Sequence, residues 1–253
     1  MSGSPGQNSG EVQLEVSDGV AVVTLNAPQR RNALTPAMAA ELIATFDEVD
    51  AREDVGALVV QAVGKSFCAG GDVQTLTDAG RDPAAPEAYA GMGAIYDSFY
   101  RLGQVRVPTI AAVRGSAVGA GMNMLLAADL RIVARDARLI CGFLKRGIHP
   151  GGGHFVLLSR LIGREAAAAM ALFGEEVDGE AAVRLGLAWE THDDDAVEGR
   201  ARELAARVAR DPALARLAIG NFRKETGPPG VSWEIATQFE RPAQMWSMRR
   251  PTD

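Results

Sequence analysis

The sequence has few cysteines and no excess of positive charge. Its 253 residues contain two cysteines, Cys68 and Cys141, at no spacing typical of a zinc site or a redox pair. Such sparse cysteine usage suits a reducing compartment. The net charge of -6 provides no overall positive field to attract nucleic acid or anionic lipid. We therefore expect a cytoplasmic protein with no nucleic-acid partner.

Long apolar runs are also missing. The most apolar stretch lies between Arg114 and Asp129, well short of the roughly 20 residues of a spanning helix, and it contains Asn123. It is typical of a buried core element, so we expect no membrane span. The leader MSGSPGQNSG lacks the basic start and the apolar segment of a signal peptide. We interpret residues 1–11 as a flexible tail.

The periodicity of the rest predicts an α/β fold. β-Rich runs flank Asp18-Gly19 and predict a hairpin over residues 12–26. Thr35 followed by Pro36 is typical of a helix start. The apolar residues that follow at helical spacing are Met38, Leu42, Phe46 and Val49. A pattern of two strands and a helix therefore opens the chain, and it recurs further on.

Continuous apolar runs predict buried strands in the middle of the chain. ALVVQAV, TIAAV and LRIVA have this character. GKSFCAGGD is expected to be a loop after the first, and RGSAVGAG a turn after the second, before the short helix MNMLLAA. After Pro150 the signal is almost entirely helical. We expect an α/β core over residues 12–190 and a helical region over 191–253.

Several familiar site motifs fail on their spacing. Gly64-Lys65-Ser66 suggests a phosphate loop, but Val59 stands where its first glycine is required. The glycines of residues 115–121 do not have the dinucleotide-binding spacing, and no G-x-S-x-G hydrolase motif occurs. His149 and His154 lack a third metal ligand. We expect neither a metal nor a nicotinamide cofactor.

Two glycine-rich turns remain, Phe67 to Asp72 and Gly119 to Asn123. Small residues at such turns let a ligand approach backbone N–H groups. Two N–H groups that converge on one oxygen form an oxyanion hole. The same residues would also suit two tight turns that permit close helix packing. Spacing alone leaves both interpretations open.

Five blocks of the sequence resemble the enoyl-CoA hydratase/isomerase (crotonase) superfamily. The resemblance spans roughly residues 12 to 225. Its blocks are NAPQRRNAL, GKSFCAGGD, IAAVRGSAVGAGMNMLLAADL, IHPGGG and RLIGREAAAAMALFGEEVDGEAAVRLGLAWE. The resemblance implies a spiral of strand-strand-helix repeats and a helical C-terminal region that forms trimers, here a homotrimer or a hexamer of two trimers. It also implies binding of acyl-CoA thioesters as substrates, without a further cofactor.

The resemblance also assigns roles to individual residues. The oxyanion donors fall on the backbone N–H groups of Gly71 and Ala120, which would polarise the thioester carbonyl. The segment expected to border the adenine and pantetheine of CoA contains Ala69, Gly71, Asp72, Val73 and Gln74. The candidates for the CoA phosphates are Arg30, Arg31 and Lys65.

The chain departs from the family pattern at its acid/base positions. Asn123 and Phe143 stand where hydratases of this family carry two glutamates. Neither side chain can accept a proton near neutral pH. His149 is the best remaining candidate base. The weaker candidates are His154, Lys145 and Asp72.

These departures leave three functional hypotheses open. The first is an enzyme that uses the oxyanion hole for enolate chemistry with an atypical acid/base, in which ordinary hydration is very slow. The second is a catalytically silent acyl-CoA-binding protein. The third is a structural subunit of a hetero-oligomer. The chain ends at Asp253, where family members usually continue with a helix that closes the site.

Overall fold

The protein forms two sheets in a computed structural model that describes residues 10–82 and 85–227. The first sheet has the strand order β1 (Val12–Ser17), β2 (Val20–Leu25), β3 (Ala57–Ala62), β5 (Thr109–Val113), β7 (Leu130–Ala134), β9 (Glu190–His192). The second has the order β4 (Ser66–Cys68), β6 (Ser116–Val118), β8 (Arg138–Ile140). The pair β1–β2 is antiparallel, and the other neighbouring strands are parallel.

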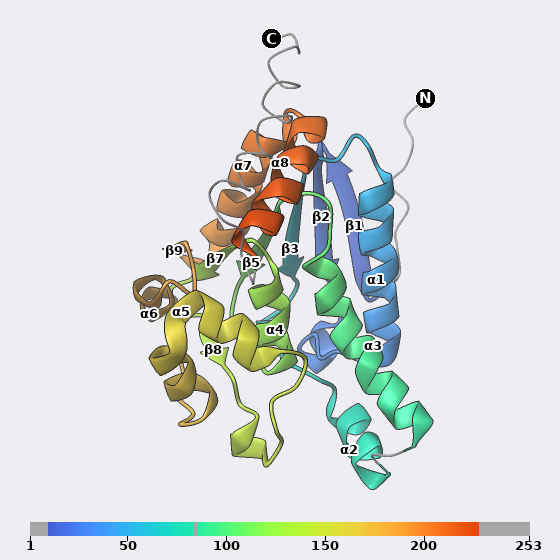
Figure 1. Cartoon of the computed structure of the whole chain (residues 1–253), viewed down its shortest axis with the longest axis vertical. Helices are drawn as coiled ribbons and strands as arrows, with labels where there is room; N and C mark the ends of the chain where they lie inside the picture. Colours follow the sequence, from blue (N-terminus) through green and yellow to red (C-terminus); the bar gives the residue numbers. More distant parts are fainter. Residues whose placement is uncertain (1–9, 83–84, 228–253) are drawn as a thin grey trace.

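The chain passes repeatedly from the first sheet to the second and returns through helices (Figure 1). β3 continues into β4, β5 into β6, and β7 into β8. The helices are α1 (Pro36–Ala51), α2 (Val73–Arg81), α3 (Pro86–Leu102), α4 (Ala120–Ala127), α5 (His154–Ala171), α6 (Gly179–Leu185), α7 (Val197–Ala209) and α8 (Pro212–Thr226). The predicted spiral of strand-strand-helix repeats is thereby confirmed. No described helix is long and apolar enough to cross a membrane.

The opening unit follows its local sequence signals. Asp18 and Gly19 both have positive φ, 50° and 76°, which is the geometry of a tight hairpin turn between β1 and β2. The side chain of Thr35 caps α1 by accepting a hydrogen bond from Met38 N at 3.1 Å, with Pro36 in the first turn. The predicted hairpin and helix are both confirmed.

The second sheet corrects two predictions, because its strands β4 and β6 lie in segments predicted as a loop and a turn. Each strand is only three residues long, too short for a periodic signal. The two strands pair with each other, and Gly115 lets them approach. A Cβ at Gly115, where φ is 63°, would lie 2.1 Å from the carbonyl oxygen of Lys65.

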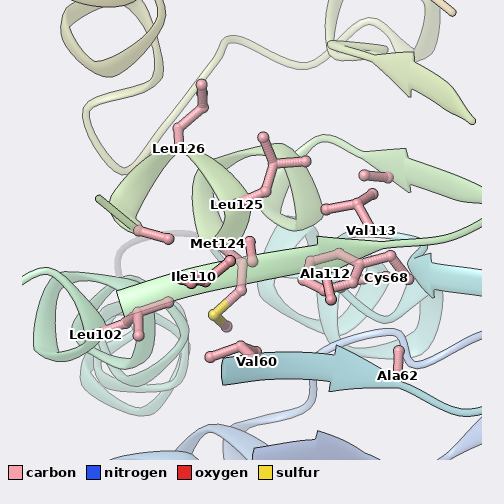
Figure 2. Packing of buried hydrophobic residues seen from close by; sticks show 14 of the residues in the cluster. Val60, Ala62, Cys68, Leu102, Ile110, Ala112, Val113, Met124, Leu125 and Leu126 are labelled. Carbon is pink, nitrogen blue, oxygen red and sulfur yellow. The ribbon is translucent and has the colours of Figure 1, made fainter. Parts of the chain in front are cut away.

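The core lies on both faces of β5, which is buried along its whole length. Figure 2 shows Met124 and Leu125 of α4 over this strand, with Leu102 at its start and Val60 of β3 beside it. Five of the six residues from Gly121 to Leu126 are fully or almost fully buried, and Leu126 is 5% exposed. The core thus fixes the position of α4, and with it the position of the glycine turn before α4.

The C-terminal segment contributes to the same core. β9 pairs with β7, and α7 packs on β2, β3, β5 and β7. The buried side chains of α7 are Val197, Ala201, Ala205 and Ala209. The division of the chain at residue 190 stays a prediction. Residues 1–9 of the predicted tail and residues 228–253 of the predicted helical region lie outside the described residues.

Candidate active site

The first glycine turn follows β4 and runs beside the segment that precedes α1. Leu34 N donates to Gly70 O at 2.7 Å, and Asp72 N donates to Leu34 O at 2.9 Å. The carbonyl of Gly70 and the N–H of Gly71 belong to one trans peptide group, in which C=O and N–H point in opposite directions. The N–H of Gly71 therefore points away from Leu34, and Gly71 lines a cavity.

Asn32 anchors this segment. Its Oδ1 accepts from Ala27 N at 2.8 Å, and its Nδ2 donates to the carbonyls of Val63 and Ser66, both at 2.9 Å. The side chain is fully buried, and two of its three hydrogen bonds tie the loop before α1 to the start of β4, while the third holds the loop itself. This tie holds Leu34 where it pairs with the first glycine turn.

The second glycine turn opens α4. Gly119 has φ 55° and ψ -112°, a conformation accessible mainly to glycine, and its N–H donates to Ile140 O at 3.0 Å. Ala120 is the first residue of the helix, so its N–H has no acceptor within the helix. A Cβ at Gly121 would lie 2.2 Å from Cys68 O, which shows how closely α4 approaches β4.

The two turns meet at one cavity. A Cβ built on Gly70 would lie 3.6 Å from Ala120 N. Gly71 and Ala120 both line a cavity of about 620 Å³, part of which is open to solvent. The apolar side chains around it include Leu76, Met92, Ile95, Val118, Phe143 and Ile148. An oxyanion hole needs two backbone donors directed at one oxygen, and the positive end of the α4 dipole lies behind Ala120. The roles of Gly71 and Ala120 as these donors stay a prediction.

Neither expected glutamate position carries a carboxylate, and no Asp or Glu among the described residues lines the cavity. Asn123 is 1% exposed and hydrogen-bonded at both ends of its amide. Its Nδ2 donates to Gly151 O at 2.9 Å, and its Oδ1 lies 2.7 Å from His154 Nδ1. Phe143 lines the cavity and meets the His154 ring edge to face, with ring centroids 4.8 Å apart.

The contacts of His154 define its tautomer. Asn123 Oδ1 can only accept, so Nδ1 of His154 carries the proton and Nε2 does not. Nε2 is buried without a hydrogen-bond partner. Burial lowers the pKa of His154 to about 4, because the charged imidazolium would be desolvated. His154 is therefore neutral at physiological pH, and it supports Asn123 from behind the cavity wall.

His149, the candidate base, lines the cavity with an exposed side chain. Its Nδ1 lies 2.6 Å from Pro150 O, an acceptor, so Nδ1 carries the proton. The ring also meets Phe155 at a right angle, with centroids 5.8 Å apart. In the neutral ring with this contact, Nε2 carries the lone pair that a general base requires.

The residues expected to contact CoA occupy several environments. Ala69 and Gly71 line the cavity, whereas Val73 and Gln74 are exposed on α2. Asp72 caps α2 by accepting from Thr75 N at 3.1 Å. Only the start of the segment, up to Gly71, lines the cavity, and its role in binding adenine and pantetheine stays a prediction.

The three cations expected at the phosphates differ in their contacts. Arg30 forms an ion pair with Glu11 and donates to Ala33 O at 2.9 Å, so phosphate binding would require it to exchange partners. Arg31 and Lys65 have exposed side chains. Their assignment stays a prediction. Lys145, a weaker acid/base candidate, is 80% exposed, lies 3.7 Å from Glu176 and does not line the cavity.

Two cavity residues were missed by sequence reasoning. Tyr96 of α3 and Arg146, which follows β8, both line the cavity. Tyr96 lies in α3 among apolar residues such as Met92 and Phe99, and no signal in the sequence separates a tyrosine of the core from a tyrosine of a site there. Arg146 is one of many arginines, and only the fold brings it to the cavity.

The cysteines and histidines form no metal site. Cys141 lines the cavity, and burial raises the pKa of its thiol to about 12. Burial raises the pKa of Cys68 to about 12 as well. Both thiols therefore stay protonated at neutral pH. The described residues contain no group of three or more His, Cys, Asp or Glu side chains arranged to hold a metal ion.

Comparison with known proteins identifies the family. Residues 15–237 match the enoyl-CoA hydratase/isomerase family. The Mycobacterium tuberculosis (strain H37Rv) protein named "Probable enoyl-CoA hydratase EchA14" is 41% identical over 244 residues, which cover 95% of this chain and 93% of that protein. The Escherichia coli K12 protein named 1,2-epoxyphenylacetyl-CoA isomerase is 35% identical over 235 residues, covering 89% and 87% of the two chains.

A comparison of the fold with solved structures points to the same family. A crystal structure of enoyl-CoA hydratase from Mycobacterium smegmatis superimposes with a TM-score of 0.85 at 28% identity, covering 96% of this chain and 93% of that one. Sequence and fold thus give the same assignment. The chain belongs to the enoyl-CoA hydratase/isomerase family.

Proposed function

We propose that the protein binds acyl-CoA thioesters with the thioester oxygen between the N–H groups of Gly71 and Ala120. The observation that carries this proposal is the meeting of these two backbone donors at one apolar cavity. The thioester oxygen would accept both hydrogen bonds, which strengthen as negative charge develops on it. Neutral donors held by the backbone need no reorganisation when that charge appears.

We propose enolate chemistry as the reaction class. His149 Nε2 would remove a proton from C2 of the acyl group, the C2–H electron pair would form the C1–C2 double bond, and the carbonyl oxygen would become the oxyanion. Return of the proton to C2 or to a conjugated carbon would regenerate the thioester. His149 is suited to this role because Pro150 O accepts from its Nδ1–H, so that Nε2 is the nitrogen of the neutral ring that can take a proton.

The side chains of Phe143 and Asn123 in the cavity lining support an atypical acid/base. Hydration adds hydroxide and a proton across a double bond, and it needs groups that hold water and transfer its proton. Phe143 has neither ability, and the one acceptor oxygen of Asn123 is engaged by His154. We therefore propose that ordinary hydration of crotonyl-CoA is very slow. Catalytically silent binding of acyl-CoA is the alternative.

Hydrogen exchange at C2 separates these possibilities. Calorimetry with butyryl-CoA first measures binding, and absence of binding would contradict the proposed function. Mass spectrometry of butyryl-CoA and phenylacetyl-CoA in D₂O then measures deuterium incorporation at C2, which reports enolate formation whatever the final product. We expect incorporation with the wild-type protein and at least a roughly 100-fold lower rate with His149→Gln. Binding without incorporation would support the silent alternative.

We also propose a homotrimer or a hexamer of two trimers in the cytoplasm. Large apolar side chains at the two ends of α5 are exposed, and their exposed fractions are 39% for Phe155, 47% for Val156, 50% for Leu172 and 81% for Phe173. Exposed apolar side chains grouped in this way are typical of contacts between protein chains. Sedimentation equilibrium should report a multiple of three 26.7 kDa subunits, and a monomer would contradict the proposal.

A further inference from the structure

Two polar side chains flank Gly151 in the cavity wall. Gly151 O accepts a hydrogen bond from Asn123 Nδ2 at 2.9 Å. A Cβ built on Gly151 would lie 2.3 Å from the hydroxyl oxygen of Tyr96, so this hydroxyl lies close against the Gly151 backbone. Asn123, Tyr96 and Gly151 all line the cavity. The amide and the hydroxyl are therefore neighbours at one place in the wall.

The amide of Asn123 can only donate a hydrogen bond to a ligand. Its Oδ1 is occupied by the Nδ1–H of His154 at 2.7 Å. Its Nδ2 has two N–H groups, and Gly151 O uses one of them. A reversed amide would place Oδ1 against Gly151 O, which can only accept. The contact with Gly151 O thus fixes the orientation of the amide and with it the tautomer of His154, and one N–H remains for a ligand oxygen.

Helix α4 sets the position of the Asn123 N–H relative to the backbone N–H of Ala120. Asn123 lies three residues after Ala120 in α4, and positions i and i+3 lie on the same face, about 5 to 6 Å apart. Side chains of a helix lean toward its N-terminus. The amide of Asn123 therefore leans toward the end of α4 at which the N–H of Ala120 is exposed. The two donors would reach oxygens on nearby carbons of one acyl chain.

We propose that Asn123 and Tyr96 form a second donor pair that recognises a second carbonyl oxygen on the acyl group. The ligand class is a 3-oxoacyl thioester, in which two carbonyl oxygens lie on alternate carbons. The first oxygen binds Gly71 and Ala120, and the second accepts hydrogen bonds from Asn123 Nδ2 and the Tyr96 hydroxyl. His154 is a positioning residue that keeps Asn123 a donor. This inference rests on the proposed binding of acyl-CoA.

The test compares the dissociation constants of 3-oxobutyryl-CoA and butyryl-CoA, which differ only at C3. Calorimetry at neutral pH should give at least about ten-fold tighter binding of 3-oxobutyryl-CoA, since each net hydrogen bond contributes about 2- to 10-fold. Tyr96→Phe removes one hydroxyl and should reduce this ratio about five-fold. Asn123→Asp keeps an acceptor for His154 but removes the donor, and it should abolish the preference.

Two controls separate the inference from its alternatives. Tyr100→Phe changes an exposed tyrosine one turn further along α3, outside the cavity, and should leave the ratio at the wild-type value. His154→Gln can still donate to Asn123 Oδ1 and should retain part of the preference, whereas His154→Leu should lose it. For the two His154 variants we compare the ratio of the dissociation constants of butyryl-CoA and 3-oxobutyryl-CoA, because a general loss of stability would not change this ratio.

The outcomes distinguish the two proposals. If neither thioester binds, the proposed function fails and the inference fails with it. If butyryl-CoA binds as tightly as 3-oxobutyryl-CoA, the proposed function stands and the second donor pair is wrong. A preference that persists in both Tyr96→Phe and Asn123→Asp also overturns the inference, because enolate stabilisation at the first pair would then explain it.

Discussion

The two walls of the cavity are built in different ways. One wall presents backbone N–H groups, and their direction is set by the pairing of Leu34 with the first glycine turn and by the start of α4. The rest of the cavity is lined by side chains from separate segments, among them Asn123, Phe143 and His149, and these form the side-chain wall. The backbone wall carries both N–H groups that the resemblance assigns to the oxyanion hole, whereas the side-chain wall carries neither expected glutamate.

This difference separates binding from proton transfer. Backbone donors persist through most substitutions, because a side-chain change leaves the N–H in place. Proton transfer depends on single side chains, and one substitution removes it. A chain can therefore retain the oxyanion hole while it changes or loses its reaction. The following predictions test each wall separately.

The largest effect is expected in the backbone wall. Ala120→Pro removes one donor at the first helical position, where proline is well tolerated, so the fold should persist. We expect the rate of C2 exchange to fall about 100-fold or more, since one oxyanion donor contributes about 3 kcal/mol. Ala120→Ser keeps the N–H and is the matched control. An equal fall of the exchange rate in both variants would show that the size of the side chain at position 120, rather than the N–H donor, is responsible.

The next effect tests the side-chain wall by restoring its carboxylates. Asn123→Glu combined with Phe143→Glu should raise the hydration of crotonyl-CoA at least about ten-fold above the wild type, because a general acid and base each contribute 10²-fold or more when well placed. We expect the gain in rate to stay below its full value, because the Phe143 ring packs on His154 and its replacement disturbs that packing. Loss of the conjugated thioester absorbance measures the rate.

The wild-type protein is the essential comparison in that assay. We expect negligible turnover of crotonyl-CoA. A rate within the usual enzyme range of about 1 to 10³ per second would contradict this expectation and show that another residue supplies the base. His149→Ala would then identify whether the candidate base is responsible.

The smallest expected effect concerns His154, which donates a hydrogen bond to Asn123 of the side-chain wall. Burial lowers the pKa of His154 to about 4, below its unfolded value of about 6.5, so the unfolded chain binds more protons between these values. The free energy of unfolding should therefore fall as pH decreases from about 6.5 to about 4, by at most about 3 kcal/mol from this residue. Urea denaturation at several pH values measures it.

His154→Gln is the matched control for that measurement. Glutamine does not titrate, and its amide can donate to Asn123 Oδ1. The variant should show a weaker pH dependence over the same interval, although other groups still titrate. An identical slope in the two proteins would show that His154 does not carry the effect.

Much of the fold could be predicted from local sequence signals. Long apolar runs predicted β3, β5 and β7, and the Thr35-Pro36 start predicted α1. The three-residue strands β4 and β6 were missed, because a strand of that length has no periodicity and forms only by pairing with another short strand. Local propensity cannot predict such a contact.

The candidate site divides in the same way. Gly71 and Ala120 were assigned from the resemblance of their turns to the family, because the spacing of the glycines alone left a purely structural interpretation open. The contact of His154 with Asn123 joins residues 31 positions apart. Tyr96 of α3 lies against Gly151, which is in the segment between β8 and α5. Such side-chain contacts depend on tertiary packing, so only the structure could show them.

The central claim is that Gly71 and Ala120 hold the thioester oxygen. Isotope-edited infrared spectroscopy tests it directly, with butyryl-CoA carrying ¹³C at the thioester carbonyl. Two hydrogen bonds in a largely apolar cavity should polarise the carbonyl and lower its stretching frequency in the wild-type complex, relative to free butyryl-CoA in water. Ala120→Ser should retain the shift, and Ala120→Pro should lose most of it. A bound carbonyl whose frequency is unchanged in the wild-type protein would contradict the account.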